Sequence, residues 1–152
     1  FDPHRAKRFT DRDGLDSTDR VLEALAQAEA SIAAIEQSTR HIYNAELNTR
    51  LRRIAGQARQ ILTMLEEDPR DLRRARKFLN VYLDGAKQVT EGYAKTHGRV
   101  TAPELEDNFR RVLATIEEVF AEQRQKLLEA DVTDLDVQIE VLTTQLKREG
   151  VV

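Results

Sequence analysis

The spacing of apolar side chains is the feature of this sequence that most restricts its fold. Between residues 21 and 42 a stripe recurs at alternating steps of four and three: Val21, Leu25, Ala28, Ile32, Ile35, Thr39 and Ile42. This period places the side chains on one face of an α-helix and is typical of a coiled-coil seam. We therefore expect an N-terminal helix over 17–46. It either folds back onto the rest of the chain or projects as an extended coiled-coil arm.

The stripe then steps by five residues, from Ile42 to Leu47. A step of five rotates the apolar face around the helix axis, which favours a break or a sharp change of direction over 43–46. Helical patterns of about 20 to 28 residues follow, each long enough to be stabilised by one apolar face. They cover 47–66, 70–96 and 102–130.

The last part of the chain contains the run "DVTDLD" at 131–136, which predicts a turn, with Thr133 as a cap for a short final helix. Short connections between helices indicate antiparallel neighbours. The predicted fold is all-α, an antiparallel bundle of four to five helices. We divide the chain into a flexible arm over 1–16, the N-terminal helix over 17–46 and a helical-bundle domain over 47–152.

Composition limits the classes of protein to which the chain can belong. There is no cysteine, which excludes disulfides, thiol nucleophiles and Cys-ligated zinc. No run approaches 18 apolar residues, and no apolar signal region is present. The expected location is cytoplasmic. The chain begins with Phe1 rather than Met, so the possibility of an upstream membrane segment stays open. Such a segment would place the protein at the cytoplasmic side of the membrane.

Charge is distributed in two blocks of opposite sign. Residues 50–77 carry nine basic against four acidic residues, and residues 104–149 carry six basic against twelve acidic residues. Such blocks either attract each other within the fold or contact a partner. We favour attraction within the fold.

The stretch from Arg73 to Tyr93 combines cationic and aromatic residues. On a helix of 100° per residue, its aromatic side chains share an apolar arc with Leu79, Leu83 and Val89, whereas most of its cations lie on the other side. Single-stranded nucleic acid is bound where aromatic rings and cations share one exposed surface. The pattern therefore predicts a buried aromatic stripe and no nucleic-acid partner.

Two groups of residues are candidate sites. An anionic group such as phosphate could bind the basic set Arg70, Arg73, Arg74, Arg76 and Lys77, although a solvated helix face explains the same charges. A divalent metal ion could bind Asp131, Asp134 and Asp136, although acidic residues at a helix start also cap its amides. No hydrolase or phosphate-loop motif is present, so catalytic residues stay unassigned, and we expect no cofactor.

Two motifs resemble the XpaC-like family, called 5-bromo-4-chloroindolyl phosphate hydrolysis proteins. The first family motif reads approximately R-x-F-L-x-Y-Y-L-P-T with a later Tyr, and the matching residues are Arg76, Phe78, Leu79, Tyr82, Leu83 and Tyr93. The second is an aspartate-containing helix entry, and the matching residues are Asp131, Asp136, Val141, Leu142, Glu149 and Gly150. The resemblance covers about 47–151 and departs at Val81 and at Asp84-Gly85, where Pro-Thr is usual.

The resemblance implies a bacterial protein whose family name describes hydrolysis of an indolyl phosphate. It also implies association with toxic-anion resistance (TelA-like) proteins. From it we expect an interaction or scaffold module linked to envelope or toxic-anion stress resistance, with a phosphoesterase as the alternative. The expected partners are a TelA-like protein and, through the first helix, a second copy of the chain.

Overall fold

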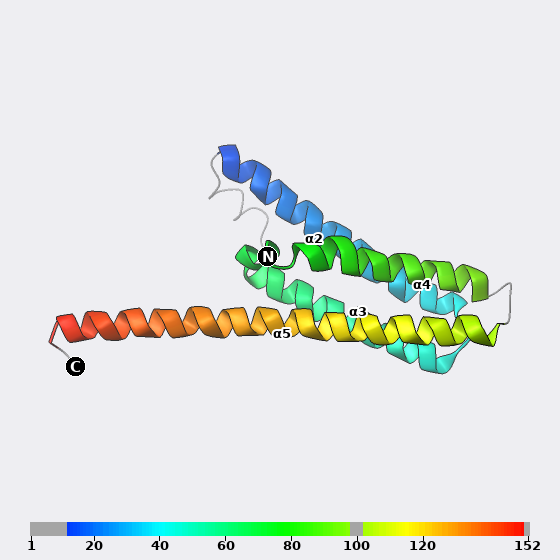
Figure 1. Cartoon of the computed structure of the whole chain (residues 1–152). Coiled ribbons are helices and arrows are strands. Elements are labelled where there is room, and N and C mark those ends of the chain that lie inside the picture. Colours follow the sequence, from blue (N-terminus) through cyan, green and yellow to red (C-terminus); the bar gives the residue numbers. More distant parts are fainter. Residues whose placement is uncertain (1–11, 98–101, 151–152) are drawn as a thin grey trace.

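The computed structural model describes residues 12–97 and 102–150, and for residues 12–18, 69 and 131–135 it describes the backbone alone. The described residues form the α-helices α2 (Arg12–Ser38), α3 (Ala45–Glu67), α4 (Asp84–His97) and α5 (Pro103–Arg148). Consecutive helices run antiparallel (Figure 1). No strand occurs within these residues. The predicted all-α antiparallel bundle is therefore confirmed.

The predicted break between the first two helices is also confirmed. α2 ends at Ser38, the 3₁₀ turn η1 (Thr39–His41) follows, and α3 begins at Ala45. Asn44 caps α3, because its side chain accepts a hydrogen bond of 3.1 Å from the backbone N–H of Leu47. Its Nδ2 donates to Glu106 of α5 at 2.8 Å. The break is thus fixed both by the local cap and by a contact with the last helix.

α2 packs against α3 and α4 and buries its apolar stripe. Ile32 and Ile35 are fully buried. The segment 17–46 therefore folds back onto the bundle, and dimerisation through this helix stays a prediction. The helix begins at Arg12, inside the segment expected to be an arm; residues 1–11 lie outside the described residues.

The core holds two pairs of aromatic rings, and each pair joins a side chain of α5 to a side chain from residues 78–93. Phe78 and Phe120 meet edge to face with ring centroids 4.8 Å apart, and Tyr93 stacks on Phe109 at 4.0 Å. Burial raises the pKa of the Tyr93 phenol. The predicted inward direction of Phe78 and Tyr93 is confirmed.

The single helix expected over 70–96 is divided in the structure. The 3₁₀ turn η2 (Pro69–Leu72) and a turn over 73–75 precede the helix. Asp68 favours the tight turn because its side chain accepts from the backbone N–H of Arg70 at 3.2 Å. The π-helical segment η3 (Phe78–Leu83) then leads directly into α4.

A π-helical turn holds one residue more than an α-helical turn, so it rotates every later side chain around the axis. Val89 was expected on the apolar arc, but it is 41% exposed. Thr90, one position further on, is buried instead. The prediction for Val89 is wrong because it assumed a constant 100° per residue through the wide turn.

The predicted turn at 131–136 is wrong as well. α5 is one helix of 46 residues that passes through this segment without a break. Its first half is packed in the bundle, whereas the end of the helix extends beyond the other helices (Figure 1). The packed face consists of Phe109, Leu113, Phe120 and Leu127.

Candidate functional site

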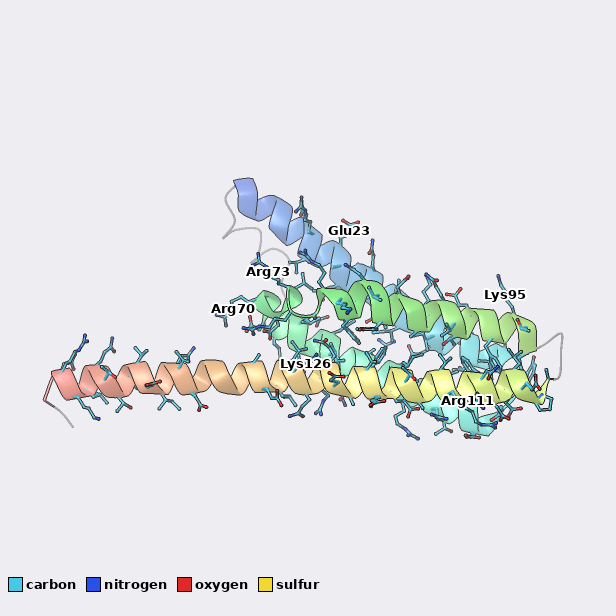
Figure 2. The ribbon with its side chains drawn as sticks, viewed as in Figure 1. Glu23, Arg70, Arg73, Lys95, Arg111 and Lys126 are labelled. Atoms are coloured by element: carbon cyan, nitrogen blue, oxygen red, sulfur yellow. The ribbon has the colours of Figure 1, made fainter. Side chains whose placement is uncertain are left out.

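Three of the predicted anion-binding residues gather at the end of the bundle where η2 meets α5. Arg70, Arg73 and Arg74 line a hollow of about 460 Å³ together with Asp68 and Asp71. We call this group the basic corner. Figure 2 shows Arg70 and Arg73 close together at this end of the molecule.

The charges of the basic corner are partly neutralised by its own carboxylates. Arg70 donates to both oxygens of Asp68, at 2.9 and 3.1 Å, and Arg74 donates to Asp71 at 2.9 Å. The hydrogen bond from Arg70 holds the pKa of the Asp68 carboxyl below its usual value. An incoming anion would therefore compete with these carboxylates for the guanidinium groups.

The opposite wall of the hollow is formed by Val137 and Gln138 of α5. Sequence reasoning missed both residues, since it placed a turn immediately before them. The described side chains that line the hollow are arginines, aspartates, a valine and a glutamine. They supply cations and carboxylates, and the described lining includes no hydroxyl and no imidazole.

The other two predicted cations lie outside the residues that line this hollow. Arg76 and Lys77 are exposed on the helix that leads into η3. The Nζ atom of Lys77 lies 5.6 Å from the centre of the Tyr82 ring, within the range of a cation–π contact. The structure thus assembles three of the five candidates and separates the remaining two.

The predicted metal site was based on a helix start at 131–136. The structure has no helix start in this segment, because α5 is continuous through it. The three-aspartate metal site stays a prediction. Asp136 is exposed, and the side chains of Asp131 and Asp134 lie outside the described residues. Among the described residues, no cluster of three or more potential ligands is suited to a metal ion.

His97, at the end of α4, has a structural environment. Its Nε2 accepts a hydrogen bond of 3.2 Å from the backbone N–H of Tyr43, and its ring lies 5.2 Å from that of Tyr93. The histidine thereby joins the loop before α3 to the end of α4.

The end of α5 exposes large apolar side chains. Val137, Ile139, Val141 and Leu142 are 54%, 54%, 53% and 55% exposed. Every described residue from 136 to 145 is exposed, so this part of the helix is covered on no side. We call residues 128–148 the α5 extension.

Comparison with known proteins gives one match. The model of a family described as "5-bromo-4-chloroindolyl phosphate hydrolysis protein" matches residues 1–142. The match starts further towards the N-terminus than the resemblance over 47–151 and includes α2. No curated protein and no solved structure matches the chain. Within the described residues, no helix has the length and apolar character needed to cross a membrane.

Proposed function

The chain belongs to the family of 5-bromo-4-chloroindolyl phosphate hydrolysis proteins, and we propose that it acts as a protein-interaction or scaffold module. The observation that carries this proposal is the α5 extension. It presents four large apolar side chains, each more than half exposed, on a helix that leaves the bundle. Exposed apolar surface of this kind marks sites of protein association.

The residues that distinguish the family motif support the same proposal. Phe78, Leu79, Leu83 and Tyr93 are buried in the core. Side chains buried in this way contribute to packing, whereas Arg76 and Tyr82 of the same motif are exposed and half-buried. The motif is therefore better explained as a requirement of the fold than as a catalytic site.

The proposed partner is a TelA-like protein of the same bacterium, in an envelope or toxic-anion stress response. The test is a binding measurement between the purified intact chain and the purified TelA-like protein, for example by biolayer interferometry. We expect saturable binding that a double substitution, Val141→Asp with Leu142→Asp, weakens. Binding that both substitutions leave unchanged would contradict a role for the α5 extension.

A second candidate function is hydrolysis of a phosphate ester at the basic corner. Three arginines beside two carboxylates in one hollow favour it, because guanidinium groups bind phosphate oxygens. The test is an assay with 5-bromo-4-chloroindolyl phosphate. We expect no turnover above that of buffer. Turnover that disappears in Arg73→Ala, with the circular dichroism spectrum unchanged, would establish the enzyme and overturn the scaffold proposal.

A further inference from the structure

The apolar residues of the α5 extension follow a heptad spacing that begins where the packed face of α5 ends. From Leu128 they recur at alternating steps of four and three: Leu128, Val132, Leu135, Ile139, Leu142 and Leu146. We call this set the α5 seam. It is sustained over three heptads of residues 128–148, which is the length at which such a pattern indicates a coiled coil.

The α5 seam does not face the bundle. On a straight helix it lies about 90° around the axis from the packed face that contains Phe120 and Leu127. Of the four described seam side chains, Leu128, Ile139 and Leu142 are 37%, 54% and 55% exposed, and Leu146 is half-buried. The seam therefore has the pattern of a helix interface, and none of the other described helices covers it.

The residue types at the seam positions indicate which kind of partner helix would cover the seam. The heptad positions conventionally called a hold Val132, Ile139 and Leu146, and the positions called d hold Leu128, Leu135 and Leu142. β-branched residues at a, combined with leucine at d, favour two strands in a parallel coiled coil. A seam of this kind is complementary to itself, since each layer pairs a residue with its own symmetry mate.

Charges beside the seam give one attractive and one repulsive pair in a parallel dimer of identical helices, because Asp131 at g would meet Asp136 at e one heptad after Arg124 meets Glu129. Arg124 and Glu129 occupy positions g and e, which meet across the interface in a parallel dimer. Both side chains are exposed. Two copies would therefore place each Arg124 next to the partner's Glu129, at the end of the seam closest to the bundles.

We propose that a second copy of this chain covers the α5 seam, so that the protein forms a parallel dimer through a two-stranded coiled coil over 128–148. The proposal rests on the proposed function in one respect, since both make the α5 extension an association element. It is an alternative to dimerisation through the first helix, whose apolar stripe is already buried within the chain.

The chain offers a matched pair of variants for the first test. Ile139→Asp with Leu142→Asp introduces two charges into the seam. Val137→Asp with Val141→Asp introduces the same charges at equally exposed positions of the same helix, about 160° around the axis from the seam. Both double variants carry similar changes in net charge and in helix propensity.

Sedimentation equilibrium of the intact protein measures the outcome. We expect a dimer at micromolar concentration for the unsubstituted chain and for the Val137/Val141 variant. The Ile139/Leu142 variant should dissociate, with a dissociation constant at least about a hundredfold higher, because unpaired charges are costly to bury. A monomeric unsubstituted chain, or two variants that dissociate equally, would overturn the proposal.

A second measurement tests the parallel arrangement. The chain lacks cysteine, so a single introduced thiol reacts with nothing else in the protein. Leu142→Cys should give a covalent dimer on mild oxidation, because the two residues at one d layer are adjacent, whereas Val137→Cys should stay monomeric under denaturing conditions. If neither variant, or both equally, became cross-linked, the parallel seam would be wrong.

These results can be distinguished from those of the proposed function. A chain that is monomeric but still binds the TelA-like protein would overturn the second-copy inference and support the interaction module. A dimeric chain that binds no such partner and hydrolyses the indolyl phosphate would support the seam and overturn the interaction module.

Discussion

Two apolar stripes of this chain have the same heptad period and opposite environments. The stripe of α2 is covered by α3 and α4, and Ile32 within it is fully buried. The seam of α5 is covered by no other described helix, and Ile139 within it is 54% exposed. A heptad period therefore predicts an apolar helix face, but it does not predict whether that face is covered within the same chain.

The two stripes differ in environment because the chain continues differently next to each of them. α2 is followed by a break at 42–44, which returns the chain antiparallel and brings α3 against the stripe. α5 has no break over its 46 residues, and its apolar residues change face between Leu127 and Leu128. The second stripe is thus turned away from the bundle by the helix geometry itself.

The largest expected effect separates the two stripes directly. Ile32→Ala should lower the free energy of unfolding of the bundle by about 2–5 kcal/mol, because it leaves a cavity in a packed core. Ile139→Ala should change the same quantity by less than about 0.5 kcal/mol at protein concentrations where the chain is monomeric, because the side chain is exposed within one copy. Urea denaturation followed by circular dichroism measures both. Equal losses would show that the two stripes are equally packed.

A smaller effect is expected for the ion pair between α3 and the packed half of α5. Arg50 donates from Nε to Glu117 at 2.9 Å, and the two side chains are only 19% and 23% exposed. Glu117→Gln should cost about 1–2 kcal/mol of unfolding free energy, because the partly buried Arg50 guanidinium then keeps only its longer contact of 3.9 Å with Glu46. Glu122→Gln is the control, since its pair with Lys126 is 62–66% exposed and should contribute less than about 0.5 kcal/mol.

The attachment of α2 to α3 also includes a charged contact on the outer side. Arg59 of α3 forms hydrogen bonds with Glu29 and Glu36 of α2, which raise its pKa. Because these side chains are 42–54% exposed, Arg59→Gln should cost about 1 kcal/mol or less. The loss should shrink in about 1 M salt, where exposed charges are screened. Urea melts at two salt concentrations check this, and a loss independent of salt would contradict it.

The smallest effect is expected when the α5 extension is removed. A chain that stops after Ala130 should match the unfolding free energy of the monomeric Ile139→Asp, Leu142→Asp variant within about 0.5 kcal/mol, because the described residues from 136 to 145 are exposed within one copy. Differential scanning calorimetry is a suitable measurement. A loss of several kcal/mol would show that the extension stabilises the bundle, and it would remove the contrast between the two stripes.

The helical architecture could be predicted from the sequence because burial follows the helix period. The stripe from Val21 to Ile42, the break after it and the inward aromatic residues all depend on side-chain spacing along one helix. The exposure of Val89 could not be predicted in this way. It depends on a wide turn at 78–83, which has no sequence signal that we recognise.

The error at 131–136 has a different origin. Aspartate and threonine are favoured at helix starts, but this local preference is weak and a longer helix can override it, so "DVTDLD" alone does not distinguish a turn from a continuous helix. The candidate site was affected by this error. Arg70, Arg73 and Arg74 are close in sequence and were predicted together, whereas Val137 and Gln138 reach the same hollow only through the continuous α5.

The length of α5 has a consequence for the size of the assembly. At about 1.5 Å per residue, its 46 residues extend for about 69 Å, and the 21 residues of the extension account for about 32 Å of that length. A two-stranded coiled coil of this kind has a fixed length. It would set how far the dimer reaches from its two bundles, and each residue inserted ahead of the seam would turn the bundles by about 100° relative to it.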